Sequence, residues 1–410
     1  MKIAIRTVRD DAEFESWHRG SEAMFGAPES DAELAVERAL VPLDRTVAAV
    51  DGERIVGTAA SYPFEMTLPG GGTIPVAGVT MVTVSSTHRR RGILREMMSF
   101  QLDDVVSRSE PIAVLNSSES SIYGRFGYGI AELYQEYRID TQRAAFGRPV
   151  PERRVPMRLI TKAEAHKELP SIYDRCRLSK PGMLTQPEAW WAGVLGERQT
   201  WKGGGSLYVV VADADEAAGT GPGYALYRIA SDTPSGTWKL TVIDMQAADS
   251  VVEAQLLRFL LDVDLVGTVR FESRPLDCPL RWWMREPREA RVVHVGDFLW
   301  VRVLDVVRAL SARRYPVQDE LVIDIEDPFG GHGSGRYLVS GGPDGASCEP
   351  THRPVDLLMD IAELGGIYLG QTRPTSLASA QRMIEVTPGA LARADAFFGW
   401  PVAPWCTTRF

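Results

Sequence analysis

Three consecutive arginines followed by a glycine, Arg89 to Gly92, form the most distinctive charged group in the chain. They come just after an apolar, β-branched run at residues 77–84 and just before residues 93–106, whose apolar side chains recur at helical spacing. A strand that enters a helix through such a turn leaves backbone N–H groups unpaired at one point, where the helix dipole favours negative charge. Arginine adds donors suited to phosphate, and glycine lets the backbone approach a ligand. The pattern predicts an anion site.

Two other phosphate-binding loops do not fit this turn. A Walker loop requires G-x-x-x-x-G-K-[ST], which is absent, and a dinucleotide-binding loop requires three spaced glycines where this turn has one. The remaining alternative to an anion site is a solvent-exposed basic helix start with no ligand.

Tyr123 has the chemistry of a general acid. Its segment, PIAVLNSSESSIYGRFGYGIAE, is typical of a strand, a polar turn containing Ser118 and Glu119, a short helix and a further strand. A phenol with a pKa near ~10 can protonate a departing thiolate. The alternative for Tyr123 is a packing role beside Phe126 and Tyr128.

A general base to act together with this acid is harder to find. The strand at 77–84 contains no acid, and Glu65, Asp103 and Asp104 lie early in the domain or on the far side of the helix. The chain ends APWCTTRF, which lacks the polar composition of a frayed tail. A buried Phe410 would hold its own α-carboxylate in place. Desolvation would raise the pKa of that carboxylate from about 3.5 towards neutral pH, where it is a better general base.

The elements that must position these residues occur twice. Residues 223–264 repeat the order of strand, strand, joint and helix, but their joint has Asp249 and Glu253 in place of the arginines and glycine. Those carboxylates would repel a phosphate, so this copy is predicted to lack the cofactor. A Pro- and Arg-rich connector, GRPVPERRVP, marks a boundary between the copies. We therefore predict an N-terminal cofactor-binding domain at 1–147, a related domain without the loop at 148–294, and an α+β domain at 295–410 whose terminus reaches the active site.

Composition excludes several classes of function. The 410 residues include 45 basic and 54 acidic side chains, and a net charge of −9 disfavours a general nucleic-acid binder. No apolar run could span a bilayer, and the first residues lack a signal-peptide core. The four cysteines show neither CxxC nor zinc spacing. We expect a cytoplasmic protein that has no metal site and binds neither nucleic acid nor membrane.

Six features together resemble one family over essentially the whole chain: HRRRGILR, IYGRFGYG, GYALYR, FLWVRV, IYLG and the terminal Phe. They are similar to the enhanced intracellular survival (Eis) family of GNAT N-acetyltransferases. The arginine-glycine turn resembles the R/Q-x-x-G-x-G/A loop that holds the pyrophosphate of coenzyme A, with Leu94 at the third small position. The resemblance implies an α+β fold, with tandem GNAT-like domains of mixed sheets flanked by helices and then a sterol-carrier-protein-like domain. It also implies acetyl-CoA as co-substrate, a small-molecule amine as acceptor, and a homohexamer.

The resemblance also implies roles for individual residues. Tyr123 corresponds to the general acid, and the C-terminal carboxylate of Phe410 corresponds to the general base. In GNAT folds the strand before the loop splays from its neighbour and its N–H groups pair with the pantetheine arm. Contacts with acetyl-CoA are implied for the strand end, the loop and the Ser-Glu dipeptide: Val82, Thr83, Val84, Arg90, Arg91, Gly92, Ile93, Leu94, Arg95, Ser118 and Glu119.

Two departures from the family concern the acceptor. Family members have an Asp after the Phe of the first helix and a Glu next to the terminal residue, where this chain has Phe25 followed by GAPES, and Arg409. A cation beside the pocket would oppose a polycationic aminoglycoside, so an aminoglycoside, a lysine-type amine and a smaller amine all remain open. A non-catalytic coenzyme A or lipid-binding protein on the same fold is the alternative from another class.

Overall fold

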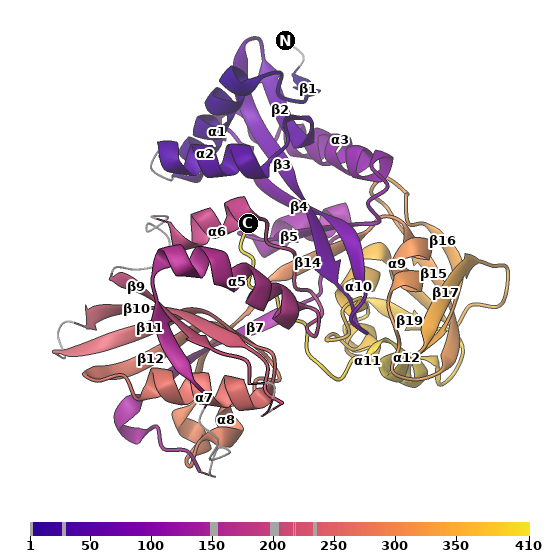
Figure 1. Ribbon diagram of the computed structural model, residues 1–410. Coiled ribbons are helices and arrows are strands. Elements are labelled where there is room, and N and C mark those ends of the chain that lie inside the picture. Colours follow the sequence, from indigo (N-terminus) through magenta and orange to yellow (C-terminus); the bar gives the residue numbers. More distant parts are fainter. Residues whose placement is uncertain are drawn as a thin grey trace.

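The computed structural model describes residues 3–26, 30–147, 155–196, 205–215, 217, 219–232 and 236–410. Their strands form two seven-stranded sheets and one five-stranded sheet, each covered by helices (Figure 1). The α+β class and the order of domains predicted from the sequence are confirmed. None of the described helices combines the length and the apolar character that crossing a membrane requires.

The first sheet has the strand order β1-β2-β3-β4-β5-β14-β6, in which β4 and β5 run parallel. Its strands are β1 (Ala4–Arg6), β2 (Thr46–Asp51), β3 (Arg54–Thr67), β4 (Thr73–Val84), β5 (Ile112–Asn116), β14 (Leu299–Val303) and β6 (Gly129–Ile130). Three helices accompany it: α1 (Asp11–Phe25), α2 (Asp31–Leu40) and α3 (Ile93–Ser107).

Both faces of this sheet are buried. Because side chains alternate along each strand, neighbouring residues pack into different cores on the two faces. On β2, Ala48 and Val50 pack in the same core as Trp17 of α1, whereas Val47 packs with Ile93 of α3. The predicted buried strand at 77–84 and the amphipathic helix after it are β4 and α3.

The second sheet has the order β13-β7-β12-β11-β10-β9-β8. Its strands are β13 (Arg291–Asp297), β7 (Leu133–Asp140), β12 (Val266–Pro275), β11 (Thr237–Ala247), β10 (Gly223–Asp232), β9 (Ser206–Ala212) and β8 (Met157–Ile160). The helices beside it are α5 (Lys162–Arg177), α6 (Glu188–Leu195), α7 (Ser250–Leu261) and α8 (Leu280–Trp283). Alternation again separates its faces, since Val209 packs with the core of α5 and α6 while Val210 packs with that of α7.

The third sheet has the order β17-β16-β15-β18-β19. Its strands are β17 (Gly345–Pro350), β16 (Gly335–Gly342), β15 (Asp319–Glu326), β18 (Leu357–Asp360) and β19 (Met383–Glu385). Its helices are α9 (Val306–Ala312), α10 (Ile361–Ile367), α11 (Pro374–Ser379) and α12 (Ala390–Phe398). The first and third sheets share one apolar core, so these two domains are packed as a unit.

Sheet membership does not follow the predicted ranges 1–147, 148–294 and 295–410 strand by strand. The strand β7 comes from the first range but lies in the second sheet, and β14 comes from the third range but lies between β5 and β6. The strand β13 spans the boundary at 294. These crossings come from pairing between distant segments, which local pattern does not reveal. The boundary at 147 adjoins residues 148–154 of the connector, which lie outside the described residues.

The inserted strand β14 attaches the third domain to the first. Its Arg302 is fully buried and pairs with Asp327 at 2.7 Å. The helix α10 lies so close to the first sheet that a Cβ on Gly129 would stand 1.8 Å from the carbonyl oxygen of Ala362. This explains the last glycine of the IYGRFGYG motif, because any other residue at this position would place a Cβ in the backbone of α10.

Candidate active site

The first sheet opens between β4 and β5. Their pairing ends at Gly78 and Val114, although β4 continues to Val84 and β5 to Asn116. Met81, with a φ of 52°, lies at the register shift between β4 and β3 and bends the end of β4. The strand splay expected from the resemblance is therefore present, and we call the space between these strand ends the first split.

The predicted strand-end residues, Val82 to Val84, line one edge of the first split. The Thr83 hydroxyl lies 2.6 Å from the hydroxyl of Thr58 on β3 and 3.5 Å from the sulfur of Met24 on α1. Since that side chain is engaged within the protein, Thr83 can offer a ligand only its backbone groups.

The arginine-glycine turn joins β4 to α3 through two left-handed residues. Arg90 has a φ of 62° and Gly92 a φ of 82°, and Gly92 is the residue at the start of the helix. A Cβ on Gly92 would meet no atom within 4 Å, so the glycine serves the left-handed conformation more than close packing. Among the described residues, no side chain caps α3. The first N–H groups of the helix, from Ile93 to Arg95, are therefore available to an anion.

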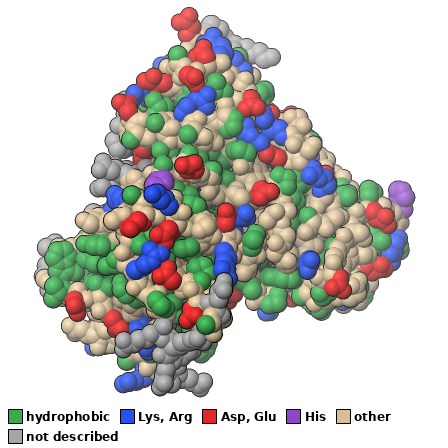
Figure 2. Space-filling view, in the orientation of Figure 1, with side chains coloured by type: hydrophobic (Ala, Val, Ile, Leu, Met, Phe, Trp, Pro, Cys, Tyr) green, Lys and Arg blue, Asp and Glu red, His purple; other side chains and the backbone are tan. Residues whose placement is uncertain are grey.

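The charges of the turn are also available. Arg89, Arg90 and Arg91 are exposed, and none of them forms an ion pair within the described part of the chain. Figure 2 shows Lys and Arg side chains on the surface over α3. Arg95 differs from these, because its guanidinium lies over the ring of Phe329 in the third domain, 5.0 Å from the ring centre. Uncapped N–H groups beside unpaired guanidinium groups fit a pyrophosphate.

Tyr123 lies on one face of the first sheet, in the apolar cluster that also contains residues of β4 and β5. It ends the short helix α4 (Ser120–Tyr123) and packs in the same cluster as Ala77 and Val79 of β4, with its ring 5.9 Å from that of Tyr128. Burial, with a smaller contribution from Glu119, raises the pKa of Tyr123 to about 12. Its hydroxyl therefore keeps its proton at neutral pH. Ser118 and Glu119 are exposed at the start of the same turn.

Phe410 lies on the other face. Its backbone N–H donates to Oδ1 of Asn116, the last residue of β5, at 3.1 Å. Its ring meets the rings of Tyr62 and Phe64 edge to face, at 6.1 and 5.5 Å between centres. The ring also lies 3.3 Å from where a Cβ of Gly78 would be.

The two predicted catalytic groups thus approach one split from opposite sides. Side chains alternate along β4, so Gly78, next to the Phe410 ring, and Val79, which belongs to the same apolar cluster as Tyr123, lie on opposite faces. A thioester between β4 and β5 would have a phenol on one side and the terminal residue on the other.

Sequence reasoning missed two residues that hold the terminus, Asn116 and Glu132. The carboxylate of Glu132 is fully buried and accepts the backbone N–H of Cys406 at 2.9 Å, and burial raises its pKa to about 8. The only available signal was a polar residue at the end of each apolar segment, and that signal alone does not indicate a partner at the far end of the chain.

The other acids considered as bases are engaged or exposed elsewhere. Asp103 lies 3.2 Å from the ring of His332, Asp104 pairs with Arg108 at 2.7 Å, and Glu65 is exposed on β3.

The corresponding helix start in the second domain is occupied by the protein itself. Asp249 accepts the N–H groups of Val251 and Val252, both at 2.9 Å, and that of Gly221 at 2.8 Å. Glu253 pairs with the buried Arg274. The helix α7 therefore lacks the open N–H groups that α3 retains.

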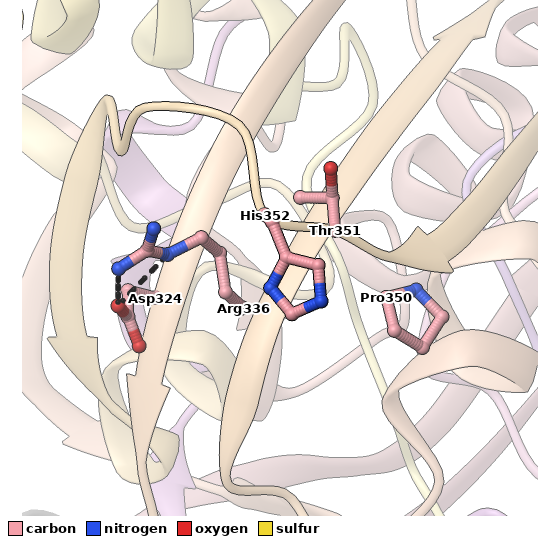
Figure 3. Close-up of a pocket in the computed structure, with 5 residues that line it drawn as sticks. All are labelled: Asp324, Arg336, Pro350, Thr351 and His352. Carbon is pink, nitrogen blue, oxygen red and sulfur yellow. Dashed lines mark hydrogen bonds and ion pairs between the residues drawn. The ribbon is translucent and has the colours of Figure 1, made fainter.

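A separate hollow of about 430 Å³ lies in the third domain (Figure 3). Its charged residues, Asp324 of β15 and Arg336 of β16, pair with each other at 2.9 Å, and Pro350, Thr351 and His352 complete the lining. Since its charges neutralise each other and Tyr123 and Phe410 are not among its lining, we do not assign this hollow to the reaction.

The structure describes Phe25 and Arg409, which mark the two positions where the chain differs from the family on the acceptor side. Phe25 is exposed at the end of α1, whose C-cap is Gly26, and residues 27–29 of the loop lie outside the described residues. Arg409 is exposed, with its guanidinium 5.2 Å from the ring centre of Phe298 and 6.0 Å from that of Tyr134.

Comparison with known proteins agrees with this architecture. An acetyltransferase (GNAT) domain family matches residues 4–131, a second GNAT family matches residues 182–303, and a sterol carrier protein domain family matches residues 306–407. The protein is therefore a GNAT-type N-acetyltransferase, an enzyme whose co-substrate is acetyl-CoA. The class is defined by the split sheet, the arginine-glycine turn and the matching domain families together.

Individual relatives identify a family within this class of enzyme. The chain is 40% identical to an uncharacterized N-acetyltransferase of Streptomyces coelicolor, covering 100% of both chains. It is 33% identical to N-acetyltransferase Eis of Mycobacterium tuberculosis, covering 91% of this chain and 90% of that protein. The crystal structure of Eis1 from Mycobacterium abscessus matches it with a TM-score of 0.88 at 33% identity, over 99% of this chain and 100% of that one. The chain belongs to the Eis family of N-acetyltransferases.

Proposed function

We propose that this enzyme transfers the acetyl group of acetyl-CoA to a primary amine, with Tyr123 as general acid and the α-carboxylate of Phe410 as general base. The observation that carries the proposal is the approach of these two residues to the first split from opposite faces. The backbone groups of Val82 to Val84, the turn from Arg90 to Arg95, and Ser118 with Glu119 are the proposed contacts with acetyl-CoA.

The reaction follows from these positions. The amine nitrogen attacks the thioester carbonyl carbon, the carbon–sulfur bond breaks, and the amide bond forms. The carboxylate of Phe410 accepts the proton that the amine loses, and the hydroxyl of Tyr123 gives its proton to the thiolate sulfur. Because burial raises the pKa of Tyr123 to about 12, this acid stays protonated across the physiological range. Holding the pyrophosphate fixes the thioester, so that the attack is effectively intramolecular.

The acceptor is proposed to be an aminoglycoside or a lysine-type amine, with Arg409 weighing against the most highly charged aminoglycosides. An acceptor panel of aminoglycosides, polyamines and lysine peptides ranks these classes. If aminoglycosides are accepted, antibiotic resistance follows as a cellular consequence.

A homohexamer is also proposed. Figure 2 shows hydrophobic side chains gathered on the surface of the second domain, which carries the exposed apolar residues Leu159, Tyr208 and Trp238. Such surface favours burial between copies. Light scattering coupled to gel filtration would give the mass, and a monomeric mass at micromolar concentration would contradict the proposal.

The experiment that tests the mechanism is thiol release from acetyl-CoA, using protein with a free C-terminus. Deletion of Phe410 and the substitution Tyr123→Phe should each lower kcat by about 100-fold or more, the usual effect of losing a general acid or base. The dissociation constant of acetyl-CoA should stay within about twofold in both variants. Undiminished turnover in both variants would reject the assignment.

A further inference from the structure

The second domain has a split of its own. Pairing between β11 and β12 ends at Val242 and Phe271, but β11 continues to Ala247 and β12 to Pro275. In the first domain the corresponding opening lies beside the predicted cofactor turn. In the second domain the first part of the chain's own C-terminal tail (residues 403–410), from Ala403 to Thr407, contacts the strand ends.

Trp405 is a buried side chain of this tail, and it is 1% exposed. Its indole N–H donates to the hydroxyl of Ser273 on β12 at 3.0 Å, and its backbone N–H donates to the carbonyl of Pro181 at 2.9 Å. Two cations contact its ring: the guanidinium of Arg274 and the ammonium of Lys180, each 4.8 Å from the ring centre. The indole is therefore fixed at several points.

The residues that contact Trp405 also connect the two separated strands. Arg274 on β12 donates to the carbonyl of Met245 on β11 at 3.1 Å. Gln246 on β11 accepts from Lys180 at 3.0 Å, and its amide lies 3.4 Å from the hydroxyl of Thr407 in the tail. The ends of both strands are thereby tied to one another and to the tail.

The contact with the second domain continues almost to the terminus. The hydroxyl of Thr408 lies 3.3 Å from that of Tyr173 and accepts from the amide of Gln186 at 3.0 Å, and Thr408 is fully buried. Only two residues follow it, and they span at most about 7 Å. The second domain therefore holds the chain two residues before Phe410, and Phe410 itself contacts Asn116, Tyr62 and Phe64 of the first sheet.

We propose that the cofactor-free domain is a clamp for the C-terminal tail, in which Trp405, held by Lys180 and Arg274, positions the carboxylate of Phe410 for proton transfer. Trp405, Lys180 and Arg274 are positioning residues, because they act through Phe410. The proposal rests on the function proposed for Phe410. A displacement of about 1 Å at a reacting group can cost about 100-fold in rate, so a loosened tail should slow the reaction without affecting the distant cofactor turn.

The test compares Trp405→Ala with two matched variants. Trp405→Phe keeps an aromatic ring between the cations but loses the bond to Ser273 and part of the buried indole. Trp282→Ala removes a tryptophan of the same domain that is 76% exposed. We expect Trp405→Ala to lower kcat at least tenfold, with the acetyl-CoA dissociation constant within twofold of wild type. Trp405→Phe should have a kcat within threefold of the wild-type value, and Trp282→Ala should leave kcat unchanged.

Three outcomes would overturn the clamp: an unchanged kcat in Trp405→Ala, an equal loss of kcat and of acetyl-CoA affinity, or a Trp405→Phe variant as slow as Trp405→Ala. If Trp405→Ala fails to fold, Lys180→Met is used instead and judged by the same criteria of kcat and affinity, because it acts from outside the tail and keeps the aliphatic stem. Deletion of Phe410 separates the two proposals. If that deletion leaves turnover intact, the proposed base is wrong; if it stops turnover while Trp405→Ala and Lys180→Met remain fast, only the clamp is wrong.

Discussion

The two GNAT-like domains share a split sheet with a helix beyond it, but they differ at the start of that helix. In the first domain Gly92 precedes α3 and leaves its N–H groups uncapped, beside exposed arginines. In the second, the Asp249 carboxylate already accepts the N–H groups of α7. A helix start attracts negative charge in both cases, and the difference is whether that charge belongs to a ligand or to the protein.

This comparison shows that the same kind of helix start can be satisfied without a ligand. An internal carboxylate supplies the capping that an anion would supply, so the second helix needs no cofactor for its stability. The sheet and the buried helix face need not change, because they depend on apolar packing on both sides of the strands.

The largest expected effect comes from making the first helix start resemble the second. Gly92→Asp should raise the acetyl-CoA dissociation constant by about 100-fold, because it brings a negative charge to the anion site and a left-handed strain of about 1–2 kcal/mol. Gly92→Asn brings a similar strain without the charge and should cost about tenfold or less. Calorimetric titration with acetyl-CoA measures both. Equal losses in the two variants would show that the charge at this site is irrelevant.

The buried carboxylate of Glu132 gives a pH-dependent effect. Its pKa is raised by burial to about 8, so between about pH 4.5 and 8 the folded state keeps a proton that the unfolded state has released. Stability from this group therefore falls as the pH rises through that window, by at most about 1.4 kcal/mol per pH unit.

Glu132→Gln removes this titration and leaves an amide oxygen to accept the Cys406 N–H. Its unfolding free energy, measured by denaturant titration at pH 6 and pH 8, should decline less than that of the wild type. Parallel declines in the two proteins would contradict the raised pKa of Glu132.

A smaller effect is expected at the capped helix. Asp249→Ala removes the acceptor of three backbone N–H groups and should lower the unfolding free energy by about 1 kcal/mol, whereas Asp249→Asn keeps a capping oxygen and should cost less. Neither variant should change acetyl-CoA affinity by more than twofold. Tighter cofactor binding in Asp249→Ala would mean that the second domain retains a latent site.

The smallest effect concerns the exposed arginines. Arg91→Ala should weaken acetyl-CoA binding about three- to fivefold at low salt, and the difference from wild type should shrink in 0.5 M NaCl because exposed charges are screened. Arg288→Ala, which changes an exposed arginine of the second domain, is the matched control and should have no effect. A difference that does not depend on salt would indicate a packing role for Arg91.

Local features of both domains were predictable. The strand, turn and helix from 77 to 106, the repeat of that order around Asp249, and the third domain after residue 295 were all read from short-range periodicity and turn residues. The exchange of β7 and β14 between sheets was not predictable in this way, because strand partners far apart in sequence leave no periodic signal in either strand.

What the sequence by itself determined is the chemistry available at each segment: an uncapped helix start beside arginines, a phenol in a short helix, and an aromatic residue at the chain end. Only the tertiary structure decided that the phenol and the chain end lie on opposite faces of one sheet. Asn116 and Phe410, which share a hydrogen bond, are 294 residues apart in sequence. Their contact depends on how the second domain packs against the tail and how β5 splits from β4, and such packing is a sum of many weak contacts that no single stretch of residues contains.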